Sequence, residues 1–428
     1  SVAYHLVLRY WLLLGGSEAV VRSFSVIVAL ATIVALYKLG RELFDGPTAV
    51  LAAVFAASNP FLVRYSQEVC AYTPAALLAV LASLYLLRAL KKDSGGNWAG
   101  YAVSAILMLY CHVLTVLVVV AHGLAAALAR ERRLTTRMIL AFLAIAAAFI
   151  PLAWCIIAVP PHPRVWLTSP GIHELEGTLA DFVGPLGYLF LLFAMVSIGY
   201  SAREKMTVES RGWRYMFLLS WALLPPVLLF VLSQWKPLFL SRYLVPSVPP
   251  LLLLVAALVR QLKPRRLAIL CGVLIVAFSV RSSVIYLRQR SDPRESYDWR
   301  DATSYMVQQV QPGDAVVFYY HHERFPFQYY RERLAPEGIA AQVFPQGSNE
   351  EVLEEAFPIE NRNHPSFAAA SYRRIWLVYS DALAATEYAP YQDLMAFRRQ
   401  LTEKFQASTE RHFGYIHLTL FAGPVPHQ

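Results

Sequence analysis

The polar stretch Arg64-Tyr65-Ser66-Gln67-Glu68, with Tyr72 one helical turn further on, lies between two long apolar runs at 48–63 and 72–90. An arginine and a glutamate at the ends of membrane helices are costly, and such residues usually have a function. Arg64 and Glu68 are four residues apart, so on a helix they can simply form an ion pair. The functional alternative is that Arg64 binds an anionic headgroup, since a guanidinium donates two hydrogen bonds to phosphate at once. Glu68 would then orient a ligand, a metal ion or the arginine itself.

A second arginine–tyrosine pair, Arg242-Tyr243, begins another apolar run. Arg and Tyr commonly anchor helices at a membrane interface, which is the simpler explanation. If Arg242 lies on the same membrane face as Arg64, the two arginines can clamp a lipid phosphate. His112 lies in a predicted turn and is either a hydrogen-bonded turn residue or a ligand.

Metal binding has little support in the spacing of these residues. Glu68 is the candidate metal ligand, and His5, His162 and His173 are expected on the same side, but no spacing matches a metal motif. The run His321-His322-Glu323 lacks the second histidine of a zinc signature and is interpreted as a polar loop. The carboxylates expected on the outer side, Glu18, Glu68, Glu174, Glu176 and Asp181, have no partners that would form a hydrolytic triad.

The composition predicts a membrane protein. The chain has 428 residues, of which 57% are hydrophobic and only 16% are charged, whereas soluble domains carry about 25% charged residues. The apolar residues fall in runs of about 15–22, close to the ~20 that cross a bilayer as a helix. The net charge of +9 comes mostly from clusters at the ends of these runs, so nucleic-acid binding is not expected. The four cysteines are interpreted as packing residues.

We predict about ten spans. The apolar run 98–129 would form a helix of about 48 Å, too long for a hydrocarbon core of ~30 Å, so we expect a break at Cys111-His112. The predicted spans are 18–39, 48–63, 72–90, 98–111, 113–129, 138–157, 185–201, 215–233, 243–262 and 267–287.

The basic residues predict the orientation of these spans. With the break at Cys111-His112, the inter-span loops of the opposite side contain only Arg64, Arg164, Lys236 and Arg242. Because basic loops stay in the cytoplasm, we expect Arg64, His112, Arg242 and the C-terminal part on the outer side. The basic residues of the predicted inner side are Lys38, Arg41, Arg88, Lys91, Lys92, Arg130, Arg132, Arg133, Arg137, Arg203, Lys205, Arg211, Arg214, Arg260, Lys263, Arg265 and Arg266.

The chain divides into three predicted parts: an interfacial juxtamembrane helix at 1–17, a transmembrane domain at 18–290, and a soluble domain at 291–428. Alternating segments make the last part an α/β domain. Its predicted helices are 299–311, 325–334, 349–357 and 392–405, and its predicted strands are 315–320, 374–379 and 415–421. It has no glycine-rich nucleotide-binding loop.

Several motifs resemble the membrane glycosyltransferases of the GT-C fold, in the bacterial branch related to protein O-mannosyltransferases and lipid A aminoarabinose transferase. The most specific is Tyr65-Ser66-Gln67-Glu68 with Tyr72, which resembles the family's Tyr-Ser-Gln-Glu-x-x-x-Tyr element. Tyr110-x-His112, Arg242-Tyr243-Leu244-x-Pro246 and Lys38–Phe44 follow the family's order. The resemblance covers most of the chain and implies donor-phosphate or substrate contacts by Arg64, Tyr65, Glu68, Tyr72, His112, Arg242 and Tyr243.

The resemblance implies inverting transfer of a sugar from a polyprenyl phosphate to a glycan, lipid or protein acceptor outside the cytoplasm, at the bacterial inner membrane. Glu68 would help to place the donor headgroup or a divalent metal ion, which is the one candidate cofactor. The family's catalytic aspartate is expected upstream of Ser1, so the N-terminal part of the protein is expected to be missing from this sequence. The alternatives are a transporter or flippase of lipid-linked glycan, which would show polar residues at mid-membrane and paired halves, and a non-catalytic membrane scaffold.

Overall fold

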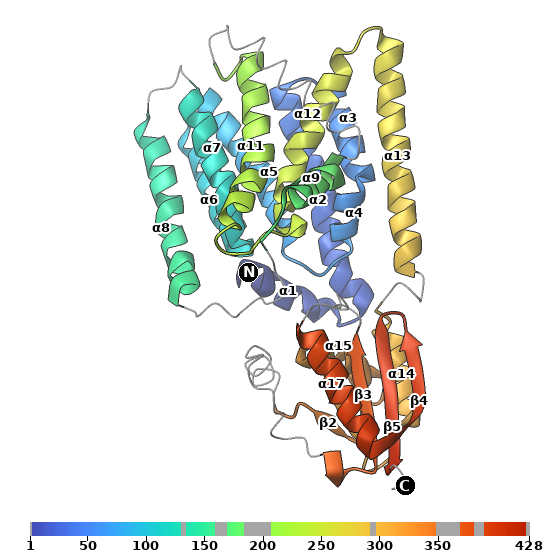
Figure 1. Ribbon diagram of the computed structural model, residues 1–428. Coiled ribbons are helices and arrows are strands. Elements are labelled where there is room, and N and C mark those ends of the chain that lie inside the picture. Colours follow the sequence, from blue (N-terminus) through green and yellow to red (C-terminus); the bar gives the residue numbers. More distant parts are fainter. Residues whose placement is uncertain are drawn as a thin grey trace. The chain divides into compact units, whose positions relative to one another are not determined.

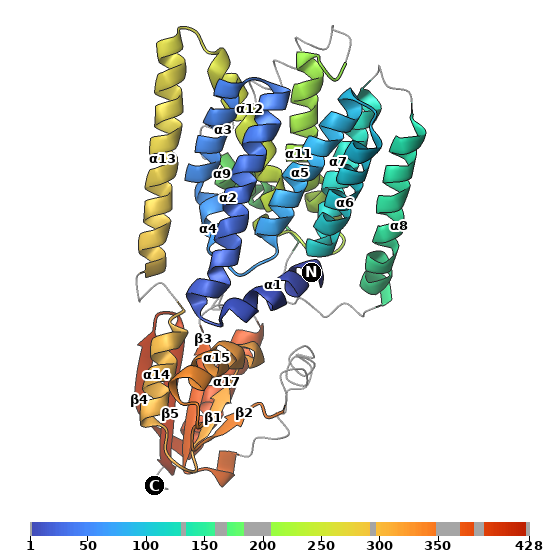
Figure 2. The same cartoon turned by 180° about the vertical axis from the view of Figure 1, so that it is seen from behind.

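The computed structural model describes residues 2–129, 134–158, 169–183, 207–291, 297–347, 369–380 and 389–424. These residues form two units, one helical and ending at Tyr286, the other beginning at Leu287 and containing a sheet. Figures 1 and 2 show the helical unit and the sheet unit from opposite sides. The predicted helices at 185–201 and 349–357 and the side chain of His162 lie outside the described residues.

Long apolar helices make up the first unit. Six described helices are long and apolar enough to cross a membrane, and the bent pair α3–α4 would make a seventh. The six are α2 (Glu18–Leu43), α5 (Tyr72–Lys91), α8 (Thr136–Ala158), α11 (Arg211–Leu232), the 3-10 turn η3 (Ser241–Ser247) joined to α12 (Val248–Gln261), and α13 (Arg265–Ser291). The chain is an integral membrane protein.

Burial separates the inner helices from the outer ones. In their most apolar windows, η3–α12 is 89% buried and α5 is 72% buried, whereas α8 and α13 are each 11% buried. Figures 1 and 2 show α8 and α13 at opposite edges of the unit. Large apolar side chains such as Ile150, Trp154 and Val273 are exposed on these two helices. Exposed apolar faces of this extent are expected of helices that face lipid.

Two helix boundaries can be compared with the sequence predictions, and one of them was not predicted. The predicted break after Cys111 is present: α6 (Gly95–Cys111) ends there, His112 is extended, and the turn η2 (Val113–Thr115) leads into α7 (Val116–Leu128). The predicted single span 48–63 is instead divided into α3 (Gly46–Ser58) and α4 (Pro60–Ser66), bent by 60°. Asn59 caps α4 and Pro60 occupies its first turn, because proline disfavours helical backbone at the residue before it.

The N-terminal residues form a short helix that lies across the ends of the spans. Helix α1 (Val2–Trp11) and the turn η1 (Leu12–Leu14) match the predicted interfacial helix in position, and Figure 2 shows α1 running crosswise to α2. Tyr4 packs against Phe24, and the Trp11 indole N–H donates to the carbonyl of Val20 at 2.8 Å. Leu6, Leu13 and Leu14 remain exposed. An apolar surface of this kind suits the membrane interface.

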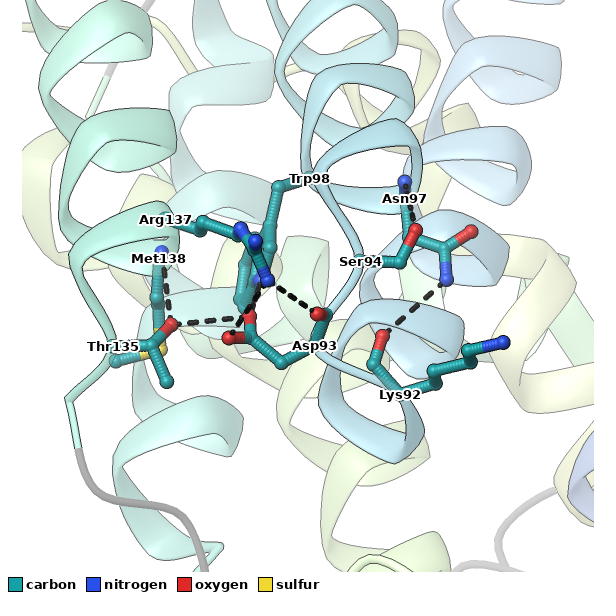
Figure 3. A network of polar contacts seen from close by, with 8 residues as sticks. All are labelled: Lys92, Asp93, Ser94, Asn97, Trp98, Thr135, Arg137 and Met138. Carbon is teal, nitrogen blue, oxygen red and sulfur yellow. Dashed lines mark hydrogen bonds and ion pairs between the residues drawn. The ribbon is translucent and has the colours of Figure 1, made fainter.

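A polar turn around Asp93 connects the C-terminal end of α5 to the N-terminal ends of α6 and α8. Asp93 accepts hydrogen bonds from the Trp98 indole N–H at 2.6 Å and the Thr135 hydroxyl at 3.2 Å. The guanidinium of Arg137 donates to the Asp93 carbonyl oxygen at 2.7 Å and lies 3.5 Å from its carboxylate. Figure 3 shows Thr135 and Arg137 converging on Asp93 from the start of α8. These contacts attach the otherwise exposed helix α8 to the bundle.

The second unit is built on a five-stranded sheet of order β2-β1-β3-β5-β4. Strands β1 (Ala315–Phe318), β2 (Gln342–Phe344) and β3 (Arg374–Ser380) are parallel. Strands β4 (Phe405–Phe413) and β5 (Ile416–Pro424) add an antiparallel hairpin beside β3. The helices are α14 (Trp299–Gln309), α15 (Arg324–Leu334) and α17 (Ala389–Lys404). The predicted α/β domain is therefore present.

Three features of this unit were not predicted. The first two are strand β4, which begins at Phe405 where the predicted helix 392–405 ends, and strand β2. The predicted polar loop at His321-His322-Glu323 is a 3-10 turn, η4, in which Glu323 is only 3% exposed. The third feature is the burial of Glu323, whose carboxylate is covered near the end of β3 and accepts a hydrogen bond from the Ser380 hydroxyl.

Candidate functional site

The stretch 64–72 comprises the last turn of α4, a short connection at 67–71 and the first residue of α5. Helix α4 ends at Ser66, and α5 begins at Tyr72. The hydroxyl of Ser25, on α2, donates to the Glu68 carbonyl at 2.7 Å, and the hydroxyl of Thr73 donates to the Tyr65 carbonyl at 2.9 Å. These two bonds replace the helical pairing that the connection lacks. Arg64 and Glu68 are therefore presented from a fixed turn.

The seven predicted site residues come together at one end of the bundle. The rings of Tyr65 and Tyr72 meet edge to face at 5.7 Å between centroids. Tyr72 in turn contacts His112 at 5.4 Å and Tyr243 at 6.0 Å, and His112 and Tyr243 lie 4.9 Å apart. The aromatic cluster Tyr65–Tyr72–His112–Tyr243 thus joins α4, α5, the α6–η2 connection and η3. We use this name for these four residues below.

Two arginines flank the aromatic cluster. The Arg64 guanidinium lies over the rings of Tyr65 and Tyr286, at 5.6 Å from each centroid. The Arg242 guanidinium lies over the ring of Tyr243 at 5.8 Å. The charges of both arginines act on the hydroxyl of Tyr65, and that of Arg242 also acts on Tyr72. The cluster therefore has positive charge at both ends.

The two arginines differ in their partners. Arg64 forms the ion pair expected from its spacing, with Nε 3.5 Å from Glu68 Oε1, and its side chain is 52% exposed. At this exposure the pair contributes little to stability. Arg242 is half-buried, and among the described residues its buried Nε has no hydrogen-bond partner. A buried guanidinium N–H without a partner is costly, and an anionic ligand would supply the acceptor that Arg242 Nε lacks.

A further carboxylate lies near Arg64. Helix α9 (Ile172–Val183) is attached to α4 by the side-chain amide of Asn59, which donates to the Phe182 carbonyl at 2.8 Å, and by the ring contact of Phe61 with Phe182 at 5.1 Å. Partial burial raises the pKa of Asp181, and the charge of Arg64 opposes this rise. The sequence marked Asp181 only as one of several carboxylates on the predicted outer side, since nothing in its spacing connects it to Arg64.

The described residues do not build a metal site at Glu68. Only one group of three His, Cys, Asp or Glu side chains in the described part of the chain is close enough to share an ion, and it lies in the second unit. His173, expected near Glu68, pairs instead with Glu174 at 3.0 Å. We therefore derive no step through a metal ion at Glu68.

Comparisons with known proteins agree with the fold. The family model described as dolichyl-phosphate-mannose-protein mannosyltransferase matches residues 2–156, which include Arg64, Glu68, Tyr72 and His112. The solved structure of ArnT from Cupriavidus metallidurans in the apo state superposes with a TM-score of 0.56 at 14% identity, covering 99% of this chain and 88% of that chain. No curated protein sequence matches the chain.

Two further structures are similar. The same ArnT bound to undecaprenyl phosphate gives a TM-score of 0.54 at 14% identity, with the same coverage of 99% and 88%. The oligosaccharyltransferase of Archaeoglobus fulgidus, in complex with Zn and sulfate, gives a TM-score of 0.48 at 14% identity and covers 90% of this chain and 60% of that chain.

Proposed function

We propose that this chain, which has the GT-C fold of membrane glycosyltransferases, transfers a sugar from a polyprenyl phosphate to an acceptor on the outer side of the membrane. The family match and the similarity to ArnT support glycosyltransferase activity in general. The observation that carries the specific donor is the aromatic cluster with Arg64 and Arg242 at its ends. Undecaprenyl phosphate, which is bound in the second ArnT structure, has the chemistry that this arrangement would recognise.

The proposed chemistry is a displacement at the anomeric carbon. An acceptor hydroxyl oxygen forms the new bond to C1 of the sugar, the bond between C1 and the phosphate oxygen breaks, and the acceptor loses its proton to a base. The leaving group is a polyprenyl phosphate, which takes the bonding electron pair as negative charge. Attack opposite to the leaving group inverts the configuration at C1.

Arg64 and Arg242 are assigned to the leaving phosphate. A guanidinium aimed at the developing charge stabilises the transition state, and removal of one such donor typically lowers the rate by about 10²–10³-fold. The unpartnered Nε of Arg242 and the exposed fork of Arg64 can both contact phosphate oxygens without breaking a buried pair. Glu68 positions Arg64, and the headgroup or the first isoprene unit of the donor packs against the aromatic cluster.

The orientation belongs to this proposal. We place Arg64, His112, Arg242 and the sheet unit outside the cytoplasm of a bacterial cell, at the inner membrane, because the basic loops gather at the opposite helix ends. Nucleotide sugars are scarce on that side, which favours a lipid-linked donor. The acceptor is a glycan, a lipid or a protein.

The test is an assay of the full-length protein in vesicles with a small panel of polyprenyl-phosphate sugars. Wild type should transfer one of these sugars, and Arg64→Ala and Glu68→Ala should abolish transfer while both variants still insert into the membrane. The matched control is Arg22→Ala, which removes another exposed arginine of an i, i+4 ion pair, with Glu18. Transfer at the wild-type rate by both site variants would rule out this assignment.

A transporter or flippase of lipid-linked glycan is the second candidate from the sequence. No observation on the described residues favours it over the transferase. The assay separates the two, because a flippase moves the intact donor across the bilayer and leaves the sugar–phosphate bond in place.

A further inference from the structure

A group of potential metal ligands lies on the hairpin β4–β5, in the second unit. Glu410 and His412 are two residues apart on β4, so their side chains are on the same face of the strand. His417 on β5 is the direct cross-strand partner of His412, which places it on that face too. The candidate ligand atoms of the three residues all lie within 4.8 Å of one another.

The side chains around this group hold it in position. The rings of His412 and His417 are 4.4 Å apart and nearly perpendicular. The ring of Tyr379, on β3, stacks on His417 at 4.8 Å with an interplanar angle of 2°. Arg398, on α17, donates to the Tyr379 hydroxyl at 3.2 Å and to Glu410 Oε1 at 2.9 Å. Two of the three candidate ligands are thus oriented by Tyr379 and Arg398, the kind of outer support that metal ligands usually have.

The donor set and its spacing select the kind of ion. Two imidazoles and one carboxylate are ligands that Zn²⁺ accepts, with bonds of about 2.0–2.2 Å. A tetrahedral ion with such bonds holds its ligand atoms roughly 3.4 Å apart. Glu410 and His412 are exposed, so their side chains can close the remaining distance without moving the sheet. Arg398 occupies Oε1 of Glu410 and leaves the second carboxylate oxygen available.

We propose that Glu410, His412 and His417 bind a divalent transition-metal ion of the Zn²⁺ class, which links the edge strand β4 to β5. This site is separate from the aromatic cluster, and it does not depend on the proposed transferase activity. Its effect is structural: β4 is an edge strand, and β5 is its only strand partner among the described residues. A bound ion adds a second connection between the two strands, and binding to the folded state stabilises that state.

The experiment measures metal binding by the full-length protein in detergent, after treatment with a chelator and dialysis. Zn²⁺ is titrated in a calorimeter, and Co²⁺ is used as a coloured substitute whose visible absorption reports imidazole ligands in a four- or five-coordinate site. Wild type is expected to bind one Zn²⁺ at this hairpin at micromolar or lower concentration. His412→Ala and His417→Ala should each weaken binding at least tenfold, and Glu410→Gln should weaken it by about tenfold.

The matched control is His173→Ala, which removes an exposed histidine next to a glutamate in the other unit. It should leave the wild-type isotherm unchanged. All three substitutions are in the hairpin β4–β5, and circular dichroism of the metal-free variants checks that each retains its fold. Absence of Zn²⁺ binding by folded wild type at 100-fold higher concentration, on the order of 100 μM, would overturn the proposal, as would wild-type affinity in both histidine variants.

Discussion

The buried carboxyl of Glu323 should make the sheet unit less stable as the pH rises. Burial raises the pKa of Glu323 from 4.5 to about 8, and the hydrogen bond from Ser380 opposes this rise. Among the described residues, its second oxygen, Oε2, is buried without a hydrogen-bond partner. The neutral acid is therefore the form that the folded state favours.

The direction and the size of the pH effect follow from the difference between the pKa of Glu323 in the folded state and in the unfolded state. Between about pH 4.5 and pH 8 the folded state keeps a proton that the unfolded state has lost. The stabilisation is therefore complete below the unfolded pKa and is lost as the pH rises through the folded pKa. At about 1.4 kcal/mol per pKa unit, the full difference is roughly 5 kcal/mol. Glu323→Gln stays neutral and can still accept from Ser380, so it should remove this dependence.

Hydrogen-exchange mass spectrometry of the full-length protein measures the effect where it arises. The opening free energy of peptides covering β1 and β3 is determined from pH 5 to pH 9 in wild type and in Glu323→Gln, with intrinsic exchange rates corrected. The wild-type value should fall by several kcal/mol relative to that of the variant. The comparison between the two proteins cancels the other titrating groups. Parallel curves for wild type and variant would refute the reasoning.

Two further predictions concern packing in the helical unit. A Cβ at Gly40 would lie 2.9 Å from Leu253 Cδ2 and 3.0 Å from the Ala49 Cα. Gly40→Ala should therefore lower the free energy of unfolding by about 1–3 kcal/mol, measured by thermal unfolding. Gly46→Ala is the control, because a Cβ at Gly46 meets no atom within 4 Å. Asp93→Ala leaves the buried Trp98 indole N–H without its acceptor, so it should lower the free energy of unfolding by about 1–3 kcal/mol. Asn97→Ala is the control: it removes only a hydrogen bond of 3.5 Å and should unfold at the wild-type temperature.

Most of the helical unit was predictable because its signals are local. Apolar runs predicted the six helices of membrane length in the described residues, and the length limit of the bilayer predicted the break at Cys111-His112. The predicted spans 98–111 and 113–129 are the helices α6 and α7, which have 17 and 13 residues and are shorter than the helices of membrane length. The bend between α3 and α4 was missed, although Asn59-Pro60 is a recognisable cap and first-turn pair, because hydropathy alone does not distinguish a straight helix from a broken one. The parallel strands β1 and β3 were found from their continuous apolar runs.

The polar edge strand β4 was missed for a physical reason. Its sequence, Phe-Gln-Ala-Ser-Thr-Glu-Arg-His-Phe, continues the charged pattern of the helix before it, and only pairing with β5 makes it a strand. The burial of Glu323 is likewise a consequence of tertiary packing, since three polar residues in a row are typical of an exposed turn.

The residues of the candidate site could be predicted from the sequence, but some of their contacts could not. Residue type, predicted side of the membrane and the family resemblance selected seven residues, and the structure brings them together at one end of the helical unit. Their role as a donor site stays a prediction. The unpartnered Nε of Arg242 and the approach of Asp181 to Arg64 depend on how η3 and α9 pack, and no spacing in the sequence encodes these relations.

Binding of a lipid phosphate beside the aromatic cluster can be measured directly. Native mass spectrometry of the full-length protein measures binding of undecaprenyl phosphate and of undecaprenol, which has the same tail without the phosphate. Wild type should bind the phosphate at least tenfold more tightly than undecaprenol. This preference should fall in Arg242→Met, which keeps only Arg64, while Arg22→Met keeps the wild-type preference. Equal binding of both lipids by wild type, or an undiminished phosphate preference in Arg242→Met, would rule out a phosphate site at Arg242.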